Sequence, residues 1–227
     1  MSAVGRTPRD ERRRRLGQNF LKPEVAQALV TGASFQATDL VVEIGAGLGS
    51  CTFALARQVD EVVAIEADPY LAGQLRQAAD RLGVTNVKVL DLDALRYRYP
   101  RRPFRVFGSL PFGVTTALMR RLFDNPNAAL VRADLVVQWD VARKRAAIPP
   151  TTLLSSTWAP WWEFSLGPRV PAKAFRPVPS VDAALLRVTR RTPPLLPLEL
   201  AAGYGEFVRR EWEAVHRHTG RIRSQRS

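Results

Sequence analysis

Val41-Val42-Glu43-Ile44-Gly45-Ala46-Gly47-Leu48-Gly49 is an apolar run that passes directly into a glycine-rich turn. A continuous apolar run is typical of a central strand in a parallel sheet. Glycine residues permit a tight turn and let a ligand approach the backbone closely. The GxGxG pattern alone is only a weak indication of a nucleotide-type site, so the neighbouring segments determine what it means.

The rest of the chain alternates expected strands and helices. We expect strands at 40–44, 61–66, 87–90, 105–108 and 134–138, and helices at 23–32, 50–58, 69–82 and 115–123. Two further strands, at 158–166 and 183–189, are expected to close the sheet. This order predicts an α/β fold, namely a Rossmann-like, doubly wound, mostly parallel sheet with right-handed crossovers.

The two ends of the chain differ in composition from the middle. Residues 1–15 form a basic N-terminal arm, 16–191 the expected catalytic domain, and 192–227 a proline-rich linker followed by a short helical C-terminal region with a basic tail. A helix is expected over 198–217, and the last ten residues are expected to lack regular structure. A length of 227 residues fits one domain with a small appendage.

Charge and composition narrow the choice of partners. The net charge is +13, and arginines cluster near both ends, including Arg12, Arg13, Arg14 and Arg15. Such clusters neutralise phosphates, so nucleic acid is the favoured partner and a membrane surface a weaker second.

Cysteine and histidine are scarce, and no apolar run reaches transmembrane length. The single Cys51 excludes an internal disulfide and is expected to be a buried, inert thiol. The two histidines do not have zinc-ligand spacing, so no metal is expected. A secretory signal is not recognisable either, and a cytoplasmic protein is expected.

Two acidic residues follow expected strands at the edge where parallel sheets bind ligands. Glu66 ends the second strand and is placed to accept both hydroxyls of a ribose, although a solvated carboxylate is the simpler alternative. Asp93 follows the third strand and is placed to accept from an adenine amine, with a helix N-cap as a serious alternative. The glycine spacing differs from the GxGxxG of dinucleotide enzymes, which favours a cofactor without phosphates, S-adenosylmethionine.

Ser109-Leu110-Pro111-Phe112 ends the fourth strand, beside the same expected pocket. The serine oxygen and the Leu110 carbonyl could hold an amino group, and Phe112 could stack on a base swung out of its strand. A Pro-Phe turn that caps the core is the alternative.

Together these motifs resemble the rRNA adenine-N6 methyltransferases, the superfamily that joins the erythromycin-resistance (Erm) enzymes to the small-subunit dimethyladenosine transferases. The resemblance covers roughly residues 11–190 and rests on 16–21, 43–47, Glu66, 93–95, 109–112 and the specific late element 175–182. It implies a catalytic motif of Ser109, Leu110, Pro111 and Phe112. It also implies cofactor contacts from Gln18, Asn19, Leu21, Glu43, Gly45, Gly47, Glu66, Asp93 and Ser109.

Segments 138–145 and 158–164 and the basic arm look closer to the Erm branch. That branch implies a monomeric enzyme that methylates N6 of an adenine in 23S rRNA and confers macrolide resistance, with Arg12 to Arg15 on the RNA. Two departures stand out: Ser109 replaces the usual asparagine, and the region after the linker is shorter than the family's helical domain. A small-subunit rRNA dimethyltransferase and a catalytically weak RNA-binding factor remain as alternatives, whereas the glycine spacing disfavours an NAD-dependent oxidoreductase.

Overall fold

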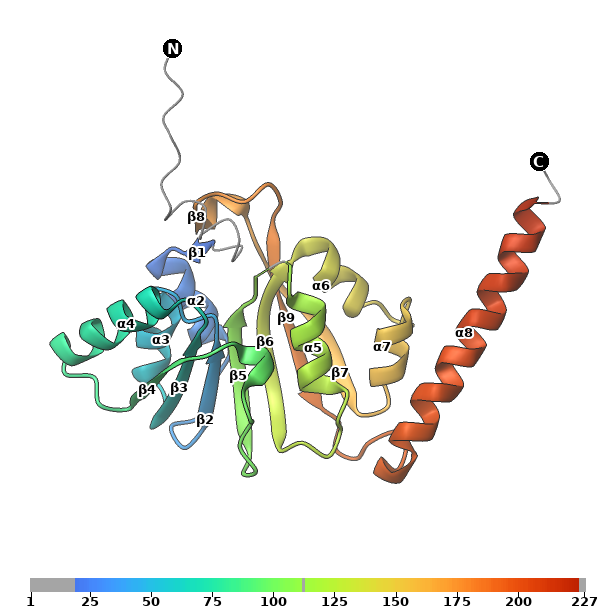
Figure 1. The fold of residues 1–227 in the computed structure, drawn as a ribbon, viewed down its shortest axis with the longest axis horizontal. Helices are drawn as coiled ribbons and strands as arrows, with labels where there is room; N and C mark the ends of the chain where they lie inside the picture. The colour runs from blue at the N-terminus through green and yellow to red at the C-terminus, as the bar shows by residue number, and fades with distance from the viewer. Residues whose placement is uncertain (1–18, 112, 225–227) are drawn as a thin grey trace, which may run out of the picture.

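The computed structural model describes residues 19–111 and 113–224, with side chains described as far as Val215 in the last helix (Figure 1). The strands are β1 Phe20–Leu21, β2 Leu40–Ile44, β3 Glu61–Glu66, β4 Val87–Asp91, β5 Phe104–Ser109, β6 Leu130–Gln138, β7 Trp162–Val170, β8 Phe175–Arg176 and β9 Ala183–Arg190. The α-helices are α2 Pro23–Gly32, α3 Ser50–Ala56, α4 Pro69–Arg81, α5 Thr115–Phe123, α6 Trp139–Arg145, α7 Leu153–Trp158 and α8 Ala201–Ser224. Short 3-10 turns are η1 Ala94–Arg96, η2 Ala172–Ala174 and η3 Leu198–Leu200.

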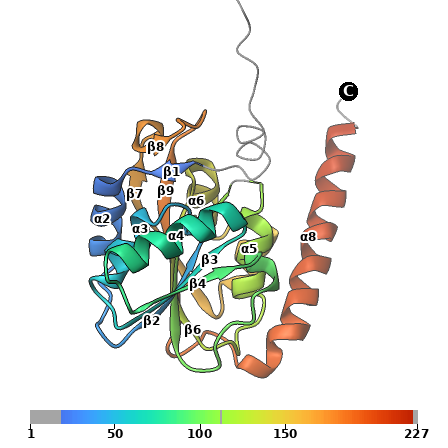
Figure 2. The same ribbon diagram turned by 60° about the vertical axis from the view of Figure 1, so that its left-hand side comes forward.

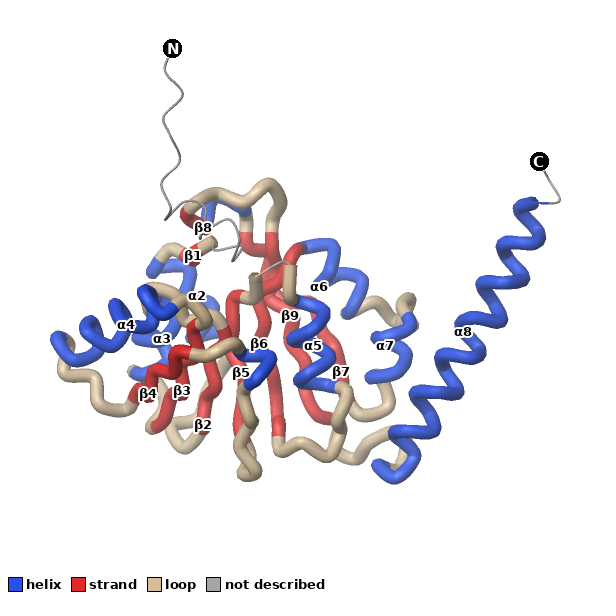
Figure 3. The backbone as a smooth tube through the Cα atoms, viewed as in Figure 1, coloured by secondary structure: helices blue, strands red, loops and turns tan. Residues whose placement is uncertain are grey.

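Seven strands form one sheet in the order β4-β3-β2-β5-β6-β9-β7, and Figure 3 shows helices on both sides of it. The first five strands in this order are parallel, and β9 is antiparallel to both β6 and β7. The expected Rossmann-like, mostly parallel sheet is therefore confirmed.

Successive side chains along a strand point to opposite faces of the sheet, so the core consists of two layers, one on each face. On β6, Leu135 packs in a cluster with α5, whereas its neighbour Val136 packs in a cluster with α2 and α3. Because both faces are covered, β2 is buried at every position, and all of its residues except Glu43 are apolar.

The closing part of the sheet differs from the expectation. Trp158 is the last residue of α7 rather than the start of a strand, and β7 begins at Trp162. Tryptophan favours strands on average, but here Thr152 caps the start of α7 by accepting from the Ser155 amide. Helix α6 was also not expected, and β6 begins four residues before the expected strand.

Helix α8 is longer than the sequence predicts. It runs to Ser224, so the expectation of an irregular tail after residue 217 is wrong for the part of the tail that the structure describes. Its first turns contact α7, and in two views its far end stands away from the sheet (Figures 1 and 2).

A buried carboxylate, Asp134 on β6, joins three strands through arginines. It accepts from Nε and Nη2 of Arg132 at 2.8 Å each and from Nε of Arg187 on β9 at 3.1 Å. Arg105 on β5 approaches it at 3.6 Å, pairs with Asp39 at 2.8 Å and donates to the Ala33 carbonyl at the end of α2. This network ties α2 to the middle of the sheet.

A two-stranded ribbon joins segments that lie far apart in the chain. Strand β1 pairs antiparallel with β8, with Phe20 opposite Arg176 and Leu21 opposite Phe175. The Lys22 amide extends the pairing by donating to the Ala174 carbonyl at 2.9 Å. Figure 1 shows the ribbon above the carboxyl ends of the parallel strands, where doubly wound folds bind ligands.

Across the described residues, every helix is too short or too polar to cross a bilayer.

Candidate active site

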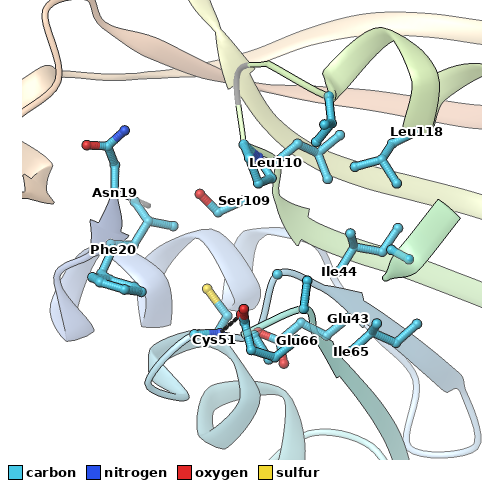
Figure 4. A pocket seen from close by; sticks show the side chains of 18 of the residues that line it. Asn19, Phe20, Glu43, Ile44, Cys51, Ile65, Glu66, Ser109, Leu110 and Leu118 are labelled. Atoms are coloured by element: carbon cyan, nitrogen blue, oxygen red, sulfur yellow. Dashed lines mark hydrogen bonds between the residues drawn. The ribbon is translucent and has the colours of Figure 1, made fainter. Parts of the chain in front are cut away.

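A cavity of about 390 Å³ lies at the carboxyl ends of β2, β3 and β5, beside the β1–β8 ribbon (Figure 4). Its volume falls in the range usual for small-molecule sites. It brings together most of the residues predicted from the sequence, namely Asn19, Leu21, Glu43, Gly45, Gly47, Glu66, Asp93, Ser109, Leu110 and Pro111. Gln18, Phe112 and Arg12 to Arg15 lie outside the described residues.

The glycine turn is shaped by two close approaches. Gly45 has φ of +77°, and a Cβ there would lie 3.2 Å from the Ser109 carbonyl oxygen. Gly47 has φ of +55°, and a Cβ there would lie 2.9 Å from the Phe20 ring. The turn therefore needs glycine both for its backbone angles and for room against β1 and β5.

Glu66 is 7% exposed and holds the turn in place from the end of β3. Its Oε2 accepts from the Gly47 amide at 2.8 Å, and its Oε1 accepts from the Asp68 amide at 2.9 Å. Burial raises the pKa of this carboxyl group. Because each carboxylate oxygen accepts more than one hydrogen bond, these contacts leave capacity for ligand hydroxyls.

We expect Glu66→Ala to weaken S-adenosylmethionine binding by about 1.5–3 kcal/mol, the usual value of hydrogen bonds to a charged group. Titration calorimetry well below the melting temperature measures this loss. Glu24→Ala, which removes an exposed carboxylate from α2, should leave the affinity unchanged. Equal affinity of the Glu66 variant and the native protein would remove Glu66 from the site.

Glu43 lies behind the turn, 2% exposed, and accepts from the Thr52 hydroxyl at 2.6 Å. Burial, reinforced by the nearby charge of Glu66, raises its pKa to about 7, although the Thr52 hydrogen bond acts in the opposite direction. Figure 4 shows both carboxylates beneath the cavity. Glu43 is therefore a site residue whose charge changes near neutral pH.

This raised pKa has a consequence for stability. Below pH 4.5 Glu43 is protonated in the folded and the unfolded chain, and between pH 4.5 and 7 mainly the unfolded chain loses the proton. Rising pH therefore removes stability through this group, on the order of 3 kcal/mol in total. We expect Glu43→Gln to unfold at an increasingly higher denaturant concentration than the native protein from pH 4.5 to 7.5. A difference that does not change with pH would contradict the assignment.

Asp93 caps the short 3-10 turn η1, which is the alternative role expected for it from the sequence. It is exposed, and its Oδ1 accepts from the Leu95 amide at 2.9 Å at the start of η1. The same residue also lines the cavity, so capping η1 places it at the cavity wall. Leu92 and Leu95 add apolar wall to the cavity, and Leu92 lies outside every motif recognised in the sequence.

The Ser109-Leu110-Pro111 segment is held by its backbone. The Leu110 amide donates to the Val136 carbonyl on β6 at 3.0 Å, and its side chain is buried. The Pro111 carbonyl accepts from the Val114 amide at 3.1 Å and from the Thr115 hydroxyl at 3.1 Å. Ser109 faces the cavity (Figure 4), so a rigid turn presents it to a ligand.

Cys51 and Phe20 are among the cavity residues that were not predicted as site residues. Cys51 is buried as expected, with a pKa raised by burial, but it also lines the cavity. Phe20 also lines it, through the contact of its ring with Gly47. Phe20 belongs to the 16–21 motif, but no local pattern shows which face of so short a strand is covered, and the pairing of β1 with β8 places its ring against the glycine turn. Groups of three or more potential metal ligands do not occur among the described residues.

The fold and this cavity define a class I methyltransferase that uses S-adenosylmethionine. The glycine turn, the strand-end carboxylate and the apolar walls suit a nucleoside with a compact cationic tail. A family model described as ribosomal RNA adenine dimethylase matches residues 9–219. The chain belongs to this family.

Similar proteins agree with this assignment. An rRNA adenine N-6-methyltransferase of Corynebacterium diphtheriae is 35% identical over 206 residues, which are 91% of this chain and 79% of that protein. The mycinamicin-resistance protein MyrB of Micromonospora griseorubida is 40% identical over 204 residues, 89% of this chain but 64% of MyrB. The chain thus spans less than two thirds of MyrB. The crystal structure of the 23S rRNA methyltransferase ErmE matches with a TM-score of 0.75 and 31% identity, covering 84% of this chain and 78% of that one.

Proposed function

We propose that the protein transfers a methyl group from S-adenosylmethionine to N6 of an adenine in 23S rRNA and so confers resistance to macrolide-class antibiotics. The observation that carries this proposal is the Ser109-Leu110-Pro111 turn, which opens into the same cavity as the glycine turn and Glu66. The similarity to MyrB and to ErmE favours the large-subunit rRNA over the small-subunit alternative.

The residues of the turn hold the amino group. The Ser109 oxygen and the Leu110 carbonyl accept its hydrogens and so keep the N6 lone pair available. Since the turn is fixed by the Val136 and Thr115 contacts, catalysis here rests on positioning and on exclusion of water. The bound cofactor supplies an electrophilic methyl group on a sulfonium. No strong base is required, because the N6 cation formed by transfer is acidic and loses its proton to water.

RNA binding is proposed to begin with the basic N-terminal arm. Arg12, Arg13, Arg14 and Arg15 would contact phosphates, which gives affinity but little sequence discrimination. The choice of adenine would come from the cavity. A monomer that acts in the cytoplasm is part of the same proposal.

Mass spectrometry of rRNA from cells with and without the protein tests this function. Methylated adenine confined to 23S rRNA is the expected result, and the mass of the modified nucleoside separates one methyl from two. Methylation confined to the small subunit would replace this proposal with the dimethyltransferase alternative. Unmodified rRNA together with no S-adenosylmethionine binding by calorimetry would favour the RNA-binding factor.

A further inference from the structure

An arginine, a tryptophan and an aspartate form a stack outside the cavity, and the arginine is its exposed member. The Arg169 guanidinium lies over the indole of Trp139, 5.0 Å from its centroid. Its Nε donates to Asp182 Oδ2 at 2.8 Å, and its Nη2 lies 2.7 Å from the same oxygen. The side chain of Arg169 is nevertheless 60% exposed.

The surrounding backbone fixes this stack. Asp182 Oδ1 accepts from the Ala172 amide at 2.7 Å, and the Asp182 carbonyl accepts from the Trp139 amide at 2.9 Å. The Ala172 hydrogen bond, together with the Arg169 interaction, lowers the pKa of Asp182, which keeps the carboxylate charged. The guanidinium plane is thus set before any ligand arrives, which reduces the entropy lost on binding.

The stack lies on the edge of the sheet that carries the active site. Val136 pairs with Ser109 across β5 and β6, and Trp139 follows Val136 by three residues. Strand β6 ends at Gln138 and Trp139 begins α6, so this is about 10 Å along the sheet, and one strand spacing of about 4.8 Å separates β6 from β5. Trp139 therefore lies roughly 11 Å from Ser109, a span of about three stacked nucleotides at about 3.4 Å each. Figure 1 shows the start of α6 on the same edge as the β1–β8 ribbon.

We propose that Arg169, held by Trp139 and Asp182, is a stacking platform for an unpaired nucleotide within about three positions of the target adenine. This inference rests on the proposed function. Unpaired bases stack on guanidinium planes, and the exposed edge of the same group suits the adjoining phosphate. An adenine that leaves its strand to enter the cavity leaves its neighbours unstacked, and the platform gives one of them a new partner.

Arg143 provides a matched comparison. It lies on α6, one turn after Trp139, is 64% exposed, and pairs with Asp140 at 3.6 Å. It therefore resembles Arg169 in charge, exposure and ion pairing. A purely electrostatic role predicts similar effects at both arginines, whereas the platform predicts an effect of arginine-to-lysine exchange at Arg169 alone.

The test uses the full-length protein and a synthetic hairpin RNA of the target region, with 2-aminopurine placed in turn at each of three positions on both sides of the target adenine. With native protein we expect the fluorescence of 2-aminopurine to be quenched by stacking at one position. Arg169→Lys should abolish this quenching and raise the RNA dissociation constant about tenfold, although it keeps the charge. Arg143→Lys should change neither quantity, and S-adenosylmethionine affinity should be native in both variants.

Methyl transfer to the unlabelled hairpin separates the two proposals. If the native protein methylates the hairpin but Arg169→Lys matches Arg143→Lys in quenching and affinity, the platform is wrong and the proposed function stands. If the native protein quenches no position while methylating the hairpin, the platform is again wrong. If native protein neither binds nor methylates the hairpin, both proposals are wrong.

Discussion

Asp134→Asn is expected to lower the free energy of unfolding by about 3–5 kcal/mol, because it leaves the buried Arg105 and two partly buried arginines without their shared carboxylate. Asp134 is fully buried and bonded to Arg132 and Arg187, with Arg105 beside it. An asparagine of the same shape fills the space but cannot neutralise these guanidinium groups. Denaturant titration followed by circular dichroism measures the change.

Asp60→Asn is the control for this substitution, because Asp60 is exposed between α3 and β3. Its effect should stay within about 0.5 kcal/mol. A loss below about 1 kcal/mol for Asp134→Asn would mean that water, rather than the carboxylate, satisfies the arginines.

Phe112→Ala is expected to slow methyl transfer roughly 5- to 150-fold, because stacking contributes about 1–3 kcal/mol per base. Phe112 follows the turn that opens into the cavity, where a base swung out of its strand would arrive. S-adenosylmethionine affinity should remain native, and Phe112→Tyr should retain activity because it keeps the ring. Single-turnover transfer to hairpin RNA, with calorimetry alongside, measures both quantities.

Phe207→Ala serves as the comparison, since this ring is half exposed on α8 and belongs to no part of the cavity. Its transfer rate should be native. Native transfer by Phe112→Ala as well would assign Phe112 to packing and leave base recognition to Ser109 and the Leu110 carbonyl.

The parallel half of the sheet could be predicted from sequence because its signals are local. Strand β2 and helices α2 and α5 have the expected bounds, and α4 ends within one residue of its expected end, next to Gly83 with φ of +64°. The glycine turn, Glu66 and Asp93 were found for the same reason. Each lies at a strand end, and parallel strands bring these ends to one edge.

The features that the sequence does not predict depend on contacts between distant segments of the chain. Trp158 and Trp162 are both buried, but one ends a helix and the other begins a strand, and local propensity does not distinguish them. The arginine network around Asp134 joins residues of β5, β6 and β9. In the sequence, nothing distinguishes these charged residues from ordinary exposed ones. The raised pKa of Glu43 likewise follows from burial that the pattern alone does not show.

The β1–β8 ribbon gives the chain an order of assembly during synthesis. The glycine turn and Glu66 are made early, but Phe20 and Leu21 obtain their pairing partners only when Phe175 and Arg176 have left the ribosomal tunnel. Until then one wall of the cavity has no strand to hold it, because contacts of such long sequence separation form late. The newly made chain therefore completes its cofactor site only after Phe175 and Arg176 have emerged, when translation has already passed well beyond residue 176.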